Sequence, residues 1–266
     1  MPFTPTHMLA ALPIARRWSS PGIFSALMIG SMVPDWPLYI PVGPEYQLTH
    51  SFPGIFIACM PLGLAVTLLF LAVVRRPLLE LAPSGLQQRL VRFVNAQPEL
   101  AAGSLARLAL AVCVGATTHI VWDAFTHRGA WGVELLPGLQ RVWFNAMGEN
   151  ISGYMVLQHG SSLIGLPLMA LLYLAWYRRA ERQPVADPII SKMARWIWIA
   201  LLIGMPLLTM VRQIALVSQF ELRPVAMALF YGVTDSGFLL IILIACYSLL
   251  FYPVLRYRQK RVSSGQ

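Results

Sequence analysis

Three ionisable residues, His119, Asp123 and His127, share one face of an otherwise apolar stretch of the sequence. Their i, i+4, i+8 spacing keeps them within about 80° of arc if the stretch is an α-helix. An ionisable side chain at membrane depth costs about 3 kcal/mol, so residues kept there usually serve a site. Imidazole and carboxylate groups are ligands for zinc, manganese and iron, so the spacing predicts a metal site on this helix.

Four more potential ligands are scattered along the chain: His7, Asp35, His50 and His159. The first three stand at boundaries between predicted elements, in the motifs Thr-Pro-Thr-His, Val-Pro-Asp and Thr-His-Ser, which nearby prolines stiffen. Taken singly, a histidine in a membrane span also suits an interhelical hydrogen bond, and Asp35 also suits a turn or a helix cap. Taken together, the seven residues favour a bound divalent metal.

The composition is that of a membrane protein. Of the 266 residues, 57% are hydrophobic and 12% are charged, which is about half the charged fraction of soluble domains. The net charge of +9 comes from basic clusters beside apolar runs, without interleaved aromatics. This pattern indicates membrane orientation and disfavours nucleic acid as a partner. Each cysteine stands alone in an apolar segment, so we expect nitrogen and oxygen ligands and no thiolates.

Five apolar segments are long enough to cross a hydrocarbon core of about 30 Å. They are Phe52–Val74, Leu105–Phe125, Tyr154–Tyr177, Trp196–Val217 and Val225–Tyr252. Two shorter apolar stretches, Met8–Ala15 and Ile23–Val33, predict an N-terminal helical hairpin, and the amphipathic segment Leu86–Val94 predicts a helix at the membrane interface.

The predicted fold class is therefore all-α, a polytopic membrane helical bundle of about five transmembrane helices plus the N-terminal hairpin. We expect a single integral-membrane domain over residues 1–266. Within it, residues 1–50 hold the hairpin and ligand motifs, residues 51–253 form the transmembrane bundle, and residues 254–266 form a basic cytoplasmic tail.

Lysine and arginine gather after the first span, between the third and fourth spans, and after the fifth. The positive-inside rule makes these regions cytoplasmic, which also places the C-terminus in the cytoplasm. The seven potential ligands then fall toward the periplasmic face of a multi-pass protein of the bacterial inner membrane. Membrane lipid is the expected partner, and the sequence leaves the oligomeric state open.

The order of these ligands resembles that of a known superfamily. The succession His, Asp, His, then His-x-x-x-Asp, then His and His is similar to the ligand order of the all-helical zinc phospholipase C and single-strand-specific nuclease superfamily. The motifs MPFTPTH, GSMVPD, THS and THIVWDAFTHRG look like a bacterial inner-membrane family of unknown function, related to proteins regarded as membrane-bound metal-dependent hydrolases. The resemblance covers about residues 1–160.

This resemblance implies that four residues gather one ion: Asp35, His50, His119 and Asp123. It also implies that His7 helps to bind a second ion, with Asp123 bridging the two. The expected cofactor is a divalent metal, with zinc favoured over manganese or iron.

His127 and His159 correspond to ligands of a third ion in the superfamily, but two features of this chain depart from the pattern. Leu163 stands where the superfamily has a carboxylate four residues after its last histidine, and Met1 and the proline after it replace an N-terminal ligand. We therefore expect one or two ions, with His159 an outer-sphere group beside Gln158.

The implied activity is metal-assisted hydrolysis of a phosphodiester or phospholipid-like substrate at the periplasmic face. Asp123 and Asp35 are the candidate catalytic residues, and Asp35 is either a ligand or, if uncoordinated, a general base. Arg212, in the fourth span, suits an ion pair with Asp235 or a grip on a substrate phosphate.

Two other functions suit the same sequence. A non-catalytic membrane scaffold would keep a structural or vestigial metal site. A transporter would line a path with polar residues through the full membrane depth, but the cytoplasmic halves of the spans hold few, such as Thr67 and Ser248.

Overall fold

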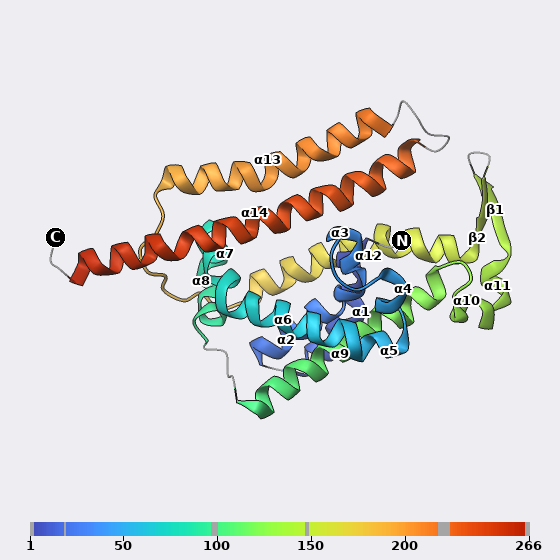
Figure 1. Cartoon of the computed structure of the whole chain (residues 1–266), viewed down its shortest axis with the longest axis horizontal. Helices are drawn as coiled ribbons and strands as arrows, with labels where there is room; N and C mark the ends of the chain where they lie inside the picture. The colour runs from blue at the N-terminus through green and yellow to red at the C-terminus, as the bar shows by residue number, and fades with distance from the viewer. Residues whose placement is uncertain (1–2, 19, 97–100, 147–148, 218–223, 264–266) are drawn as a thin grey trace. The chain divides into compact units, whose positions relative to one another are not determined.

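The computed structural model describes residues 3–18, 20–96, 101–146, 149–217 and 224–263. Most of these residues are helical, and the sheet among them is one antiparallel hairpin, in which β1 (Val142–Ala146) pairs with β2 (Glu149–Ser152) (Figure 1). In this part of the chain, five helical segments are long and apolar enough to cross a membrane: Phe52–Leu81, Ala102–Thr126, Gly153–Arg179, Lys192–Leu216 and Met227–Tyr257. The predicted fold class is confirmed.

The chain divides into two compact units. The first comprises Met1–Pro37, Val42–Leu68 and Pro98–Ala180, and it contains all seven predicted metal ligands. The second comprises Leu38–Pro41, Leu69–Gln97 and Glu181–Gln266. The single-domain organisation stays a prediction.

Short helices and turns of the N-terminal region lead into the first span. In chain order they are η1 (Thr4–His7), α1 (Met8–Ala15), α2 (Pro21–Gly30), η2 (Val33–Asp35), α3 (Trp36–Tyr39) and α4 (Tyr46–Thr49). The first span is a series of short elements, α5 (Phe52–Gly54), the π-helical η3 (Ile55–Cys59), α6 (Met60–Leu69), the π-helical η4 (Phe70–Val74) and α7 (Arg75–Leu81). The helices α1 and α2 pack together as the predicted hairpin.

The core of the first unit lies between this hairpin and α9 (Ala102–Thr126). Its buried side chains are small or aliphatic: Ala11, Ala15, Ala26, Leu27, Met28, Leu108, Ala111 and Val112. Glycines let the two backbones approach closely, because a Cβ on Gly115 would lie 2.3 Å from the Leu27 carbonyl oxygen. A Cβ on Gly30 would lie 2.4 Å from the Val112 carbonyl oxygen. This close crossing brings the end of α2 against α9 one turn before His119.

After α9 the chain forms two short helices, α10 (Trp131–Leu135) and α11 (Pro137–Gln140), then the β-hairpin and the long helix α12 (Gly153–Arg179). The second unit contains α7, the amphipathic α8 (Ser84–Asn95), α13 (Lys192–Val217) and α14 (Pro224–Ser263). The helices α13 and α14 run side by side (Figure 1). Basic residues expected in a tail after the fifth span continue α14 as far as Ser263.

Candidate metal centre

Four side chains from three parts of the first unit converge on one point. Asp35 ends η2, His50 follows the last residue of α4, and His119 and Asp123 lie one turn apart on α9. Each offers one ligand atom, and these four atoms lie within 4.8 Å of one another. Proline at the start of η2 fixes the turn that carries Asp35. A cluster of two imidazoles and two carboxylates of this kind can hold a metal ion.

The spacing of the ligand atoms suits a small cation. Nε2 of His50 lies 3.5 Å from Oδ1 of Asp35 and 3.6 Å from Oδ2 of Asp123. Nε2 of His119 lies 3.6 Å and 3.3 Å from the same two oxygens. Four ligands at about 2.0 Å from a tetrahedral ion stand about 3.3 Å apart. The cluster therefore needs little movement to close around such an ion.

The four ligand atoms are also left without partners by the protein. Oδ1 of Asp35, Nε2 of His50, Nε2 of His119 and Oδ2 of Asp123 are buried, and none accepts or donates a hydrogen bond among the described residues. Buried polar atoms are normally paired. Because the unpaired atoms face one another, a single bound cation would satisfy all four.

The remaining polar atoms of the same side chains are held by the protein. Nδ1 of His119 lies 2.8 Å from the Ser31 carbonyl oxygen, and Nδ1 of His50 lies 3.0 Å from that of Tyr46. A backbone carbonyl can only accept, so both rings donate from Nδ1 and present Nε2 to the cluster. Oδ2 of Asp35 accepts a 2.6 Å hydrogen bond from the Thr4 hydroxyl. Such outer partners orient metal ligands.

Asp123 faces a second group through its other oxygen. Oδ1 of Asp123 lies 3.6 Å from Nε2 of His7, whose buried ring stacks on His119 with 3.8 Å between the ring centroids. Both ring nitrogens of His7 are buried and lack hydrogen bonds in the described structure. The Asp123 carboxylate therefore contributes Oδ2 to the four-residue cluster and faces the unpaired His7 imidazole with Oδ1.

Electrostatics within the centre set the charge of its histidines. Burial lowers the pKa of His50, but the carboxylates of Asp123 and Asp35 outweigh it and raise the pKa to about 9. Burial, together with the neighbouring His119, lowers the pKa of His7 to about 3. Burial would raise the pKa of Asp35, but the imidazoles of His50 and His119 hold it below its ordinary value. In the absence of metal, His50 is protonated and His7 is neutral near neutral pH.

The sequence matches the model of a protein family. A family model described as "Domain of unknown function (DUF4184)" matches residues 1–254. The chain belongs to this family. No curated protein and no solved structure matches this DUF4184 chain. The expectation of an uncharacterised family is confirmed, and the relation to metal-dependent hydrolases stays a prediction.

The other predicted ligands of the DUF4184 chain lie outside the four-residue cluster. His127 lies at its edge, with Nδ1 3.5 Å from Oδ1 of Asp123 and 3.2 Å from the Asp123 carbonyl oxygen. Nε2 of His127 lies 3.3 Å from the Gln158 side-chain amide. His159 is exposed on α12, and the structure does not bring it to the cluster. The position of Leu163, also exposed, supplies no carboxylate.

Arg212 lies on α13 in the second unit and is exposed. No ion pair between Arg212 and Asp235 forms among the described residues, and the Asp235 carboxylate accepts a hydrogen bond from the Gln213 amide. The substrate-binding role of Arg212 in the DUF4184 chain stays a prediction.

Sequence reasoning did not identify the residues that orient the ligands. Thr4 and Tyr46 each stand near a predicted histidine, and Tyr46 stacks on His50 with 3.8 Å between ring centroids. The i, i+4 spacing of Tyr46 and His50 was an available signal. Ser31 acts through its backbone carbonyl, which every residue has, so the residue type gives no signal of this role.

Proposed function

We propose that this DUF4184 protein is a membrane-bound metal-dependent hydrolase that cleaves a phosphodiester or phospholipid-like substrate at the periplasmic face of the bacterial inner membrane. The observation that carries the proposal is the set of four buried, unpaired ligand atoms that face one point. Structural carboxylate–histidine networks pair their polar atoms internally, whereas these four ligand atoms have no hydrogen-bond partner among the described residues, which supports a bound cation.

Zinc is the proposed metal. Two imidazole nitrogens and two carboxylate oxygens form a donor set that zinc accepts at four-coordinate geometry, and manganese or iron would use the same donors with additional ligands. Asp35, His50, His119 and Asp123 would hold the first ion. Oδ1 of Asp123 and the unpaired His7 are the groups available to a second.

When bound, a divalent cation supplies Lewis acidity, which polarises a phosphoryl oxygen and makes water nucleophilic at neutral pH. Asp35 is fully buried and its Oδ2 already accepts from Thr4, so we assign it as a ligand and not as the general base. Asp123 would belong to both ligand sets, with Oδ2 in the four-residue cluster and Oδ1 facing His7.

The substrate would enter past His50 and His127. Their side chains are 13% and 25% exposed, whereas those of His7, Asp35 and His119 are completely buried. His127 is thus the imidazole of this centre that a substrate meets first. Its Nε2 accepts a hydrogen bond from the Gln158 side-chain amide, so this nitrogen would serve as a base that takes up a proton from an incoming water.

A membrane lipid is the proposed substrate class because of where the centre lies on α9. Asp123 is close to the C-terminal end of this helix, about 32 Å along the axis from Ala102. Arginines crowd the sequence before Ala102, and the positive-inside rule places them in the cytoplasm. The centre would then lie at the level of the outer headgroups, and the exposed apolar residues Phe52 and Phe56 follow His50 closely in the sequence.

The test is hydrolysis by the full-length protein in detergent. Purified, zinc-loaded protein is assayed with a chromogenic phosphodiester and with phosphatidylglycerol, beside chelated protein and Asp123→Asn. We expect turnover that disappears on chelation, returns with zinc and is absent from Asp123→Asn. His159→Ala serves as the matched control and should retain activity. Full metal content without hydrolysis of either substrate contradicts the proposal and favours the non-catalytic scaffold.

A further inference from the structure

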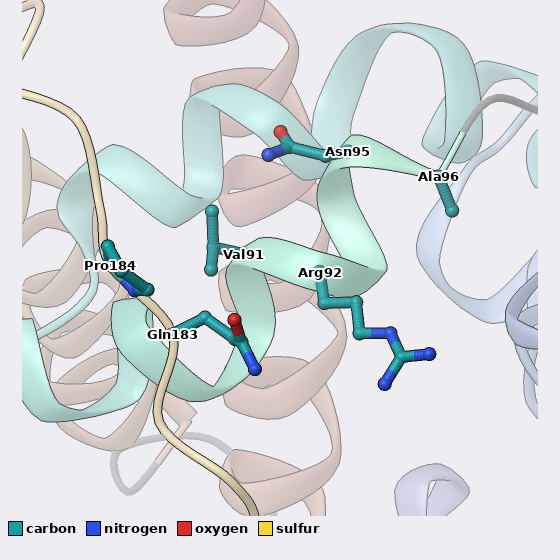
Figure 2. A pocket seen from close by; sticks show the side chains of 6 residues that line it. All are labelled: Val91, Arg92, Asn95, Ala96, Gln183 and Pro184. Carbon is teal, nitrogen blue, oxygen red and sulfur yellow. The ribbon is translucent and has the colours of Figure 1, made fainter.

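We propose that the second unit contains a binding site for the phosphate headgroup of an anionic membrane lipid. The site is a cavity of about 460 Å³ between α8 and the segment that precedes α13. Figure 2 shows the six side chains that line it: Val91, Arg92, Asn95, Ala96, Gln183 and Pro184. None of them is acidic, and three can donate hydrogen bonds.

Arg92 is the cation of this cavity. Its exposed side chain extends away from α8, on the same side of that helix as the Gln183 amide (Figure 2). No hydrogen bond or ion pair between described residues engages its guanidinium, so all five N–H donors are available. A planar guanidinium binds two phosphate oxygens at once, which makes phosphate the anion that this group fits best.

Two amides complete the polar wall. The Gln183 backbone N–H donates a 2.8 Å hydrogen bond to the Gln88 carbonyl oxygen, which fixes the segment against α8. Oδ1 of Asn95 accepts a hydrogen bond from Arg76 at 3.4 Å, so the NH₂ group of Asn95 remains a donor. The lining of the cavity therefore combines one positive charge with amide donors.

The end of α8 would repel an anion if its carbonyls were free, because a helix C-terminus carries partial negative charge. Arg75 neutralises this partial negative charge. Its guanidinium donates to the Phe93 carbonyl at 2.9 Å and also to the Ala96 carbonyl. Residues 75–95 contain four arginines and one acid, Glu80, whose carboxylate accepts from the Ile189 backbone N–H. The segment 180–191, which forms the other wall, adds Arg182, Glu181 and Asp187, so the two segments together carry five arginines and three acids and a net charge of +2.

The position of α8 selects a lipid over a soluble phosphate. The helix begins at Ser84, directly after the first span ends at Leu81, so it lies at one membrane surface. Leu90 and Val94 are partly or fully buried while Arg92 is exposed, as in a helix that lies at headgroup level. Basic pockets at that level bind anionic lipid headgroups.

The experiment is lipid titration of the full-length protein in detergent, read by native mass spectrometry. Phosphatidylglycerol and phosphatidylcholine are compared for the wild type, Arg92→Gln and Arg256→Gln. Arg256 is an exposed arginine of α14 in the same unit and serves as the matched charge control. We expect the wild type and Arg256→Gln to prefer phosphatidylglycerol equally, and Arg92→Gln to bind it about tenfold more weakly.

One more variant and a competition experiment test whether the ligand is a lipid headgroup. Arg92→Lys keeps the charge but loses the planar fork, so its affinity should fall between those of the wild type and Arg92→Gln. Excess inorganic phosphate at constant ionic strength should leave phosphatidylglycerol bound, and displacement would overturn the lipid assignment. Equal phosphatidylglycerol affinity of the wild type and Arg92→Gln would overturn the site itself. None of these readouts depends on metal or hydrolysis.

Discussion

The Ser31 carbonyl oxygen accepts a hydrogen bond from Nδ1 of His119 at 2.8 Å, across the contact between α2 and α9. This bond determines which nitrogen of His119 faces the four-residue cluster. It depends on the close approach of the two backbones at Gly115, where a Cβ would lie 2.7 Å from the Ser31 nitrogen. The N-terminal hairpin therefore contributes to the centre through packing as well as through its own ligands.

Substitution of Gly115 should disturb the centre from one helical turn away. Gly115→Ala inserts a methyl group against backbone atoms, and overpacking of this kind costs about 1–3 kcal/mol. We expect a lower melting temperature and weaker zinc binding, measured by competition with a chelating dye. Gly103→Ala, on the same helix with nothing within 4 Å of the new Cβ, is the control. Equal zinc affinity in both variants would show that the α2–α9 contact does not orient His119.

The hydroxyl of Thr4 should support the metal affinity through Asp35. Thr4→Val removes the 2.6 Å hydrogen bond to Oδ2 of Asp35 and retains the side-chain shape. Loss of an outer partner typically lowers metal affinity about 10- to 100-fold. Thr117→Val, whose exposed hydroxyl bonds only the Cys113 carbonyl of its own helix in the described structure, should leave affinity unchanged. A Thr4→Val protein with wild-type zinc affinity would contradict the role assigned to this bond.

Zinc binding should release close to one proton near neutral pH. The raised pKa of His50, about 9, keeps this imidazole protonated in the metal-free protein, while the pKa of His7, about 3, leaves that ring neutral. A ligand must lose its proton to bind, so apparent affinity should rise with pH and level off above about pH 9. Calorimetry in two buffers of different ionisation enthalpy counts the protons. A pH-independent affinity between about pH 6 and 9 would contradict this charge assignment.

Metal removal should destabilise the folded protein. An ion that binds the native state alone stabilises it by about 4 kcal/mol at a thousandfold excess over Kd. Chelation should therefore lower the melting temperature of the wild type and of His159→Ala alike. Asp35→Asn, which lacks one charged ligand, should melt at nearly the same temperature with and without chelator. An unchanged wild-type melting temperature after chelation would count against a bound ion.

The five spans were predictable because long apolar runs without charges have one stable solution in a bilayer. The residues at which the spans end were less predictable from the sequence. The predicted first span ends at Val74, but the helix continues to Leu81, since Arg75 is buried and bonds the end of α8 instead of marking a boundary. Whether an arginine such as Arg75 is buried depends on tertiary contacts, which hydropathy does not report.

For the site, helical periodicity alone places His119 and Asp123 on one face of α9, as the structure has them. Bringing Asp35 and His50 to the same point required the family resemblance, because those residues lie on short elements whose directions no local pattern gives. The sequence likewise offered no means to see that His159 faces away, since this depends on the rotation of α12.

The metal content of the purified wild-type protein, measured by inductively coupled plasma mass spectrometry after chelator-free purification, tests the central claim most directly. We predict at least one zinc per chain in the wild type and in His159→Ala, and none in His119→Ala or Asp35→Asn. A wild-type protein without a stoichiometric divalent metal, or equal metal in all four proteins, would contradict the claim that the four-residue cluster is a metal centre.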